Sequence, residues 1–406
     1  MRMTSAFARS YSLLDHPEKI IAVYRGWDAF ERAHGGPSII DFDLSNLNDT
    51  ASFDSRRQIL FALEDLRHQI DDSTHEGEFL RDKLQGSIFY LRALMGQQIP
   101  FGEYVKYTLG ILPEYFSAQE IDDTRSKLNE LLAFFGLQLR EEDRGKFEAK
   151  LVIHDPEEIK RGILNSQEFW LARLREEGIP SPIKLRLNVE FTETDAYWSN
   201  WIDGSFTGGI RLRINLHSRK KYELGKPLAL CLHEICGHAV QMSIWRELIA
   251  QGTINQACGL TTVHSPEMFV AEGLGQTVAD LFGSEEVFPR EFLLSRWLQY
   301  YTLMILHNAH LMTYEGRPVE DILHYAGSNL PFSYPGVLEA EIRDRGTDPL
   351  YRTYQLSYAA AERLIRNLIR DLAPQQRRKL FIEMYTRPMT PTQLQGLAAR
   401  IRSEQL

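Results

Sequence analysis

The spacing of apolar residues changes twice along the chain, from a helical period to a strand period and back. From about residue 55 to 177, apolar side chains recur every three or four positions, which predicts a series of amphipathic helices. Segments 183–191 and 210–216 instead alternate apolar and polar residues, which predicts two half-buried strands. The helical period returns from about residue 227. The pattern therefore predicts a mainly α protein with a small antiparallel β-sheet, an α+β fold.

The two predicted strands also indicate how the chain is organised. Because the segment between them is rich in turn-forming residues, we expect it to connect an antiparallel pair. We expect the second strand to lie at an edge, where an extended peptide could add by backbone hydrogen bonds. The sequence Gly-Ile-Pro-Ser-Pro at 178–182 marks a boundary. We therefore expect a helical N-terminal region, residues 1–180, that forms a wall or lid of a cleft, and a second region, residues 181–406, that carries the sheet.

Composition and charge narrow the classes of function. The chain has 406 residues, of which 43% are hydrophobic and 25% are charged, and its formal net charge is −9. Both signs of charge are interspersed, with no basic patch typical of nucleic-acid binding and no run near the roughly 20 apolar residues of a membrane span. The N-terminus lacks a long apolar run, and three cysteines in so long a chain favour a reducing compartment. We therefore expect a cytoplasmic protein with no nucleic-acid or membrane partner.

The segment Leu228–Val240, LALCLHEICGHAV, places two histidines and a glutamate inside an otherwise apolar stretch. Pro227 near its start and Gly252 past its end predict one helix over about 227–251. Burying such groups costs several kcal/mol unless a partner compensates. A metal ion is one such partner. Two satisfied core histidines beside a coincidental glutamate are the alternative, and the hexamer alone does not separate the two.

The spacing of the two histidines is the main clue to chemistry. His233 and His238 are five residues apart, so a regular helix would separate them by about 140°. One extra residue accommodated as a π-bulge would bring them together, and the adjacent Gly237 lowers the cost of that distortion. Glu234 follows the first histidine, where a zinc hydrolase keeps its general base. The spacing is therefore consistent with a distorted zinc-binding helix, and two core histidines beside a coincidental glutamate stay the alternative.

The next predicted helix carries a carboxylate suited to a third ligand. It begins after Ser265, as N-cap, and ends near Gly283. Glu272 lies in its middle among apolar neighbours, so we expect it to be buried. Gly273 and Gly275 each cost about 1 kcal/mol relative to alanine, which is intelligible if another backbone or a ligand approaches closely. A buried carboxylate on a second helix is what a two-histidine zinc site requires.

Other ionisable residues nearby have simpler explanations. Glu267 and Asp280 are alternatives to Glu272 on the same helix, but Glu267 lies in the first turn, where the helix dipole favours a carboxylate. Asp280 is near the far end and could be a surface residue. His307 and His310, three residues apart, could ligate a metal, but no acid neighbours them. We expect both of these histidines to lie in the core.

The motif residues resemble those of known zinc peptidases. HEICGH is similar to the expanded HExxxH motif of dipeptidyl peptidase III and of the tubulin-tyrosine carboxypeptidase (QEGLA-motif) group, whose following helix carries Glu-Gly-Leu-Ala. Ala271–Gly275 matches that sequence, with glycine for the last alanine. HEICGHAVQ also resembles an uncharacterised bacterial peptidase family with a late QALSY-like segment, which Tyr354–Tyr358 matches with one residue missing. The resemblance covers about 205–285 well and 350–360 loosely, and does not extend to the first 180 residues.

The resemblance implies a zincin-like catalytic region within residues 181–406 that binds one Zn²⁺. His233, His238 and Glu272 would be the metal ligands, with a fourth position left for water. Glu234 would take a proton from that water and pass it to the leaving amine.

An oxyanion donor is also expected beside the zinc. Tyr351, Tyr354 and Tyr358 form one stripe on a predicted helix, and such stripes are usually core, but buried phenols need partners. Tyr358 and His264 are our candidates for the donor. For His264, an ordinary loop position is an equally good interpretation.

The resemblance further implies peptide or protein substrates and, as the first hypothesis, a carboxypeptidase. The basic residues Arg211, Arg213, Arg219 and Lys220 could bind a C-terminal carboxylate, although a solvated strand face is the favoured interpretation of the first two. An aminopeptidase or an endopeptidase that trims a precursor peptide is an alternative. A peptide-binding protein that keeps a peptidase fold without turnover is another. The sequence does not indicate the oligomeric state.

Overall fold

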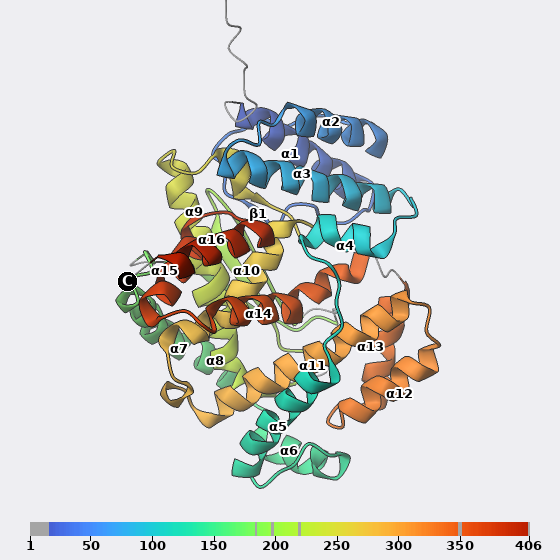
Figure 1. Ribbon diagram of the computed structural model, residues 1–406, viewed down its shortest axis with the longest axis vertical. Helices are drawn as coiled ribbons and strands as arrows, with labels where there is room; N and C mark the ends of the chain where they lie inside the picture. The colour runs from blue at the N-terminus through green and yellow to red at the C-terminus, as the bar shows by residue number, and fades with distance from the viewer. Residues whose placement is uncertain (1–15, 183–184, 196–198, 218–220, 348–350, 405–406) are drawn as a thin grey trace, which may run out of the picture.

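The computed structural model describes residues 16–182, 185–195, 199–217, 221–347 and 351–404. Helices build most of the molecule, and a small sheet lies among them (Figure 1). The mainly helical α+β class predicted from the sequence is confirmed. No helix of the described residues is long and apolar enough to cross a membrane.

Among the described residues, seven α-helices precede the main part of the sheet, and the remaining α-helices follow it together with shorter 3₁₀ and π segments. The first group comprises α1 (Pro17–Ala33), α2 (Arg56–Gln69), α3 (His75–Leu94), α4 (Phe101–Leu109), α5 (Ala118–Phe134), α6 (Arg144–Leu151) and α7 (Pro156–Glu176). The second comprises α8 (Lys226–Leu230), η3 (Cys231–Ala239), α9 (Val240–Ala250), α10 (Pro266–Thr277), η5 (Val278–Phe282), α11 (Arg290–Tyr314), α12 (Val319–Asn329), α13 (Pro335–Thr347), η7 (Tyr351–Gln355), α14 (Leu356–Ile369), α15 (Pro374–Thr386) and α16 (Pro391–Ser403). In Figure 1, α1, α2 and α3 lie together at one end, and α10 and α14 cross the middle.

The main sheet has five strands in the order β3-β5-β4-β1-β7. These strands are β1 (Phe42–Asp43), β3 (Leu187–Thr192), β4 (Asn200–Ser205), β5 (Gly209–Asn215) and β7 (Leu260–Thr261). A second sheet pairs β2 (Val152–Ile153) with β6 (Tyr222–Glu223). The two strands predicted by alternation are therefore present as β3 and β5, although Ile183 and Lys184 lie outside the described residues.

The pairing of these strands differs from the prediction in two ways. β3 and β5 are parallel, with Val189 opposite Leu212, because the turn-rich segment contains another strand, β4, that runs antiparallel to β5. The predicted edge position of the second strand is also wrong, since β5 has a partner on both sides. The edges of the sheet are β3 and the short β7. The sheet is consequently mixed rather than purely antiparallel, and β5 offers no free backbone to a peptide.

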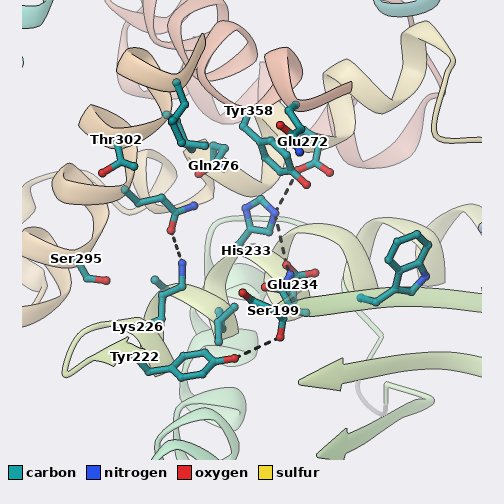
Figure 2. A pocket seen from close by; sticks show the side chains of 18 of the residues that line it. Ser199, Tyr222, Lys226, His233, Glu234, Glu272, Gln276, Ser295, Thr302 and Tyr358 are labelled. Carbon is teal, nitrogen blue, oxygen red and sulfur yellow. Dashed lines mark hydrogen bonds and ion pairs between the residues drawn. The ribbon is translucent and has the colours of Figure 1, made fainter. Parts of the chain in front are cut away.

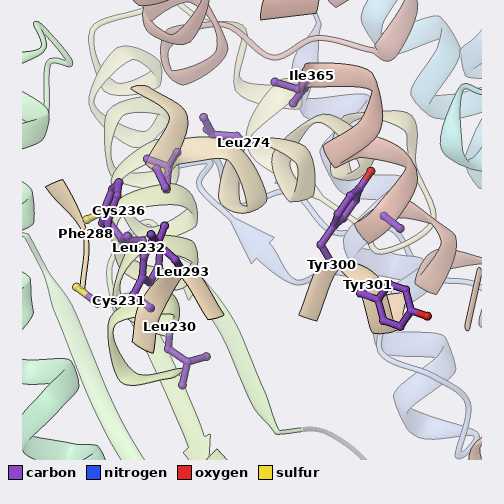
Figure 3. Close-up of a cluster of buried hydrophobic side chains, with 14 of the residues drawn as sticks. Leu230, Cys231, Leu232, Cys236, Leu274, Phe288, Leu293, Tyr300, Tyr301 and Ile365 are labelled. Carbon is purple, nitrogen blue, oxygen red and sulfur yellow. The ribbon is translucent and has the colours of Figure 1, made fainter. Parts of the chain in front are cut away.

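Helices from both the N-terminal and the C-terminal parts of the chain pack around the motif helix, which is the continuous helix α8–η3–α9 that carries HEICGH. One apolar cluster joins α1, α2 and α3 to α9, with Trp27, Leu63, Leu84 and Trp245 among its fully or almost fully buried members. A second cluster surrounds the preceding part of that helix and includes Leu232, Leu274 and Ile365 (Figure 3). The three cysteines are free and buried, and Cys231 and Cys236 belong to this second cluster. This packing fixes the motif helix on several sides.

The histidines of α11 lie in the core, as predicted. His307 donates from Nε2 to the backbone carbonyl of Glu114 at 3.0 Å, and its ring packs edge-on against Phe116. His310 is fully buried near the ring of Phe101. Neither belongs to the one cluster of potential metal ligands found among the described residues.

We expect His307 to weaken the fold on acidification. Burial lowers its pKa from 6.5 to about 4, because the core disfavours an imidazolium. Below pH 6.5 the unfolded chain gains a proton that the folded chain refuses until near pH 4. The free energy of unfolding should therefore fall across that window, by up to about 3 kcal/mol from this group. His307→Gln should reduce the fall, as measured by urea unfolding of chelator-treated protein at pH 7, 6, 5 and 4.5. Equal slopes for both proteins would contradict the assignment.

Candidate metal centre

The motif helix contains a π-helical segment at its centre. α8, η3 and α9 form one continuous helix from Lys226 to Ala250, and Gly252 follows its end with a φ of +72°. The π-helical part is η3, Cys231–Ala239, which spans both motif histidines. The wider turn brings the Nε2 atoms of His233 and His238 to 3.1 Å from each other. The π-distortion predicted from the five-residue spacing is confirmed.

Two glycines let the next helix approach this segment closely. A Cβ atom added at Gly237 would lie 2.8 Å from the Cα of Gly275, and one added at Gly275 would lie 2.8 Å from the ring of His233. Any larger side chain at either position would push α10 away from η3. Gly237 therefore serves close helix packing. The predicted N-cap Ser265 precedes α10, but its hydroxyl donates to the Thr262 carbonyl instead of capping the helix.

The close approach places Glu272 against both imidazoles. Its Oε2 lies 3.3 Å from Nε2 of His233 and 3.6 Å from Nε2 of His238. Ligand atoms arranged tetrahedrally at zinc bond lengths of about 2.0–2.2 Å are themselves about 3.3–3.5 Å apart. The three separations of 3.1, 3.3 and 3.6 Å therefore match three corners of a tetrahedron around one ion. These residues can hold a metal.

The charges of the cluster are suited to a bound cation. Glu272 is 4% exposed, and among the described residues its Oε2 has no hydrogen-bond donor. Burial acts to raise the pKa of Glu272, but the nearby imidazoles of His233 and His238 outweigh it and hold the pKa well below its ordinary value. Burial acts to lower the pKa of His238, and Glu272 and Glu234 reverse that effect. A buried anion that converges with two imidazoles favours a cation at their centre.

The other carboxylates considered for the third ligand are held elsewhere. Glu267 forms a buried ion pair with Lys83 of α3, whose side chain is fully buried. Asp280 accepts from Arg296 at 2.6 Å. Both carboxylates are therefore neutralised by basic side chains, whereas Glu272 faces the histidines.

Glu234 lies next to the cluster and is held by a residue that the sequence did not indicate. Its Oε1 is 3.7 Å from Nε2 of His233 and accepts a hydrogen bond from Asn200 Nδ2 at 2.5 Å. Asn200 begins β4, the strand missed by the alternation pattern. Figure 2 shows Glu234 and His233 side by side at the pocket. The Asn200 contact fixes the orientation of the carboxylate beside the imidazole.

The tyrosine stripe contributes a different member than expected. Tyr354, in η7, donates from its hydroxyl to Oε1 of Glu272. Tyr358, our candidate oxyanion donor, lines the pocket and packs edge-on against Tyr354, with ring centroids 5.5 Å apart. Tyr354 orients the carboxylate of Glu272, so that Oε2 is the oxygen that faces the histidines.

His264 also lines the pocket, in a setting that keeps it neutral. Its ring stacks on Tyr90 with centroids 3.9 Å apart. Burial lowers the pKa of His264 to about 3. At neutral pH the imidazole can therefore donate or accept a hydrogen bond but carries no charge.

A cavity of about 1130 Å³ opens beside the cluster. It exceeds the roughly 300–1,000 Å³ of drug-sized ligand pockets, so it has room for several residues of a peptide. Its walls come from the early part of the chain, the sheet, the motif helix and the helices that follow, with members that include Asp41, Phe147, Trp201, Glu234, Leu306 and Tyr358. The N-terminal half of the chain thus forms part of the wall.

The basic cluster suggested for binding a carboxylate does not form as expected. Arg211 and Arg213 both bind Asp203 of β4, at 2.9 and 2.6 Å. Neither lines the cavity. Arg219 and Lys220 lie outside the described residues. The solvated strand face considered for Arg211 and Arg213 is therefore the better interpretation, since their charges are satisfied within the sheet.

Comparisons with known proteins give a similarity of fold. No family model and no curated protein matches the chain. A Colwellia psychrerythraea protein described as a lipoprotein superposes with a TM-score of 0.58 at 13% identity, covering 86% of this chain and 68% of its own. A Bacillus anthracis strain Ames protein described as an oligoendopeptidase F gives a TM-score of 0.32 at 12% identity, covering 95% and 69%. The first indicates a related fold, and the second is too weak to indicate one.

Proposed function

We propose that this protein is a zinc-dependent peptide hydrolase, and within that class a carboxypeptidase. The observation that carries the proposal is the convergence of His233, His238 and Glu272, with Glu234 beside them at the wall of a large cavity. Two neutral imidazoles and one carboxylate are a donor set that suits zinc and leaves a position for water. Calcium and magnesium prefer sites made of oxygen ligands alone.

Different residues of the site would bind the metal, act as the general base and orient these groups. Zinc held by the three ligands would polarise a peptide carbonyl and lower the pKa of a water toward 7. Glu234 would act as the general base that takes a proton from the attacking water and passes it to the nitrogen of the leaving amine. Asn200 donates to Oε1 of Glu234 and holds this carboxylate beside His233. Tyr354 keeps Glu272 in its orientation toward the ligand cluster.

Two residues of the cavity wall could stabilise the oxyanion that forms from the carbonyl. Tyr358 offers a hydroxyl donor next to Tyr354. His264 offers a ring N–H and stays uncharged because its pKa is about 3. Preorganised donors of this kind each contribute about 3 kcal/mol to transition-state stabilisation. Tyr358 is our first choice because it lies near the residue that binds Glu272.

The choice of a carboxypeptidase follows the resemblance of Ala271–Gly275 to the tubulin-tyrosine carboxypeptidase group. Both apolar and polar residues line the cavity. It therefore suits a peptide substrate that carries side chains of either kind. A peptide-binding protein without turnover remains the second candidate function. It is favoured only by the size of the cavity, whereas turnover also explains Glu234.

Cleavage profiling of a peptide library tests the proposal. Zinc-loaded protein should release single residues from the C-termini of N-acetylated peptides, because the N-terminus is blocked and the general base lies beside the proposed metal. Mass spectrometry of products against time measures the position of each cut. Protein treated with a chelator is the control and should cleave nothing. Cuts at internal bonds would replace the carboxypeptidase with an endopeptidase, and bound zinc without cleavage of any peptide would favour the binding protein.

A further inference from the structure

Lys226 places a cation in the wall of the cavity that contains the proposed catalytic cluster. It is the first residue of α8 and lies seven residues, about two helical turns, before His233. Both side chains line the same cavity (Figure 2). The helix that holds the metal ligands therefore also carries this ammonium group.

The surroundings of Lys226 do not neutralise its charge. Its Nζ donates to the neutral amide oxygen of Gln299 at 2.5 Å, and no carboxylate of the described residues forms an ion pair with it. Burial lowers the pKa of Lys226, and the more distant Glu223 and Glu234 offset this only in part. Its position at the start of a helix adds to the cost, because the helix dipole disfavours a cation there. A purely structural role for Lys226 would not explain why a basic side chain lies here without a carboxylate partner.

Another lysine of the same cavity provides the contrast. Lys221 lies 2.5 Å from Glu148 and 3.2 Å from the hydroxyl of Tyr334, so its charge is paired. Lys226 is only partly buried, but its ammonium lacks a carboxylate partner among the described residues, and a bound anion would offset the cost of its partial desolvation. Of these two lysines, Lys226 is therefore the one that is suited to hold an anionic group of a ligand.

The opposite wall adds neutral hydrogen-bonding groups around the ammonium. Ser295, Gln299 and Thr302 lie at positions i, i+4 and i+7 of α11, on one face of that helix, and all three line the cavity. In Figure 2, Ser295 and Thr302 lie across from Lys226. Apolar residues of the same helix, Leu298, Leu303 and Leu306, line the cavity beside them. The arrangement combines one cation, neutral polar groups and an apolar surface.

We propose that Lys226, with Gln299, binds the C-terminal carboxylate of the peptide substrate and restricts cleavage to the chain end. The inference rests on the proposed peptidase function and adds the residue that selects the terminus. The Cα atoms of Lys226 and His233 are about 10 Å apart along the helix, and one extended residue covers about 3.5 Å. The long side chain of Lys226 can cover most of the distance that one substrate residue leaves. The C-terminal carboxylate can therefore contact Lys226 while the scissile bond lies beside His233. An ammonium–carboxylate hydrogen bond is charge-assisted and thus stronger than a neutral one.

The test compares matched peptides that differ only at the C-terminus. A set of N-acetylated pentapeptides is synthesised once as free acids and once as C-terminal amides, and kcat and KM are measured for each pair. Wild-type protein should prefer the acid by about 10- to 100-fold in kcat/KM, because a hydrogen bond to a charged group is lost with the amide. Lys226→Met should lower kcat/KM for the acid by about the same factor, mainly through KM, and lower it much less for the amide, so that the preference for the acid is lost.

Matched variants separate the inference from a general loss of structure. Lys221→Met should keep the preference for the acid, since that lysine is paired within the protein. Lys226→Arg should retain most of the preference because it retains the cation, whereas Lys226→Gln should lose it. A wild-type protein that cleaves both peptides equally, or a Lys226→Met variant that keeps the preference, would overturn the role of Lys226. Cleavage of neither peptide by the wild type would instead overturn the proposed function itself.

Discussion

Glu234→Gln is expected to leave the metal bound and to lower kcat for peptide hydrolysis by about 10²- to 10⁴-fold. The amide has nearly the shape of the carboxylate but cannot accept a proton from water. Asn200 can still contact the side-chain oxygen of the glutamine, so the local structure should persist. The measurement combines zinc content by mass spectrometry with steady-state kinetics on peptides cleaved by the wild type.

A second carboxylate of the cavity provides the control for this substitution. Glu148 lines the same cavity, but it is bound to Lys221 and accepts from Tyr334 at 2.5 Å. Glu148→Gln should therefore change kcat much less than Glu234→Gln does. A Glu234→Gln variant with wild-type kcat would remove Glu234 as the general base. Loss of zinc from that variant would assign it a part in binding the metal instead.

The convergence of the proposed metal ligands was the most predictable part of the site, because most of it is local. Two histidines five residues apart on one helix can share an ion only if the helix is widened, and the π-helical segment provides this. The role of Glu272 was predictable because a buried carboxylate beside Gly273 and Gly275 needs a close neighbour. Gly275 indeed faces the ring of His233. In both cases the residues that carry the signal are close in sequence.

The groups that orient the site could not be predicted, because they come from pairings distant in sequence. Asn200 reaches Glu234 only because β4 pairs with β5, and the segment that contains β4 has too many turn-forming residues to display alternation. Tyr354 was placed with Tyr358 on one helical stripe. In the structure, Tyr354 lies in the 3₁₀ helix η7 and Tyr358 lies in the following helix α14. The two side chains therefore do not share one face of a single α-helix. Tyr354 donates its hydroxyl hydrogen bond to Glu272.

Substitution of a single proposed ligand is expected to remove most of the bound metal and nearly all activity. Purified wild type should carry about one equivalent of zinc, as a site with three protein ligands does. His233→Ala and Glu272→Ala each remove one of three ligands, so zinc affinity should fall by more than about 100-fold, beyond the loss typical of residues that only orient ligands. Zinc content after dialysis and competition with a chromogenic chelator measure this.

Graded variants distinguish loss of a ligand from damage to the fold. Tyr354→Phe removes only the hydrogen bond to Glu272 and should weaken zinc binding by about 10-fold. Asp280→Asn alters a carboxylate of η5, just after α10, that is bound to Arg296, and this variant should keep its zinc. Zinc should also raise the thermal stability of the wild type but not of Glu272→Ala, because only a site that binds in the folded state stabilises it. Full zinc retention in both His233→Ala and Glu272→Ala would refute the ligand set, since the remaining pair of groups cannot by itself supply a three-ligand site.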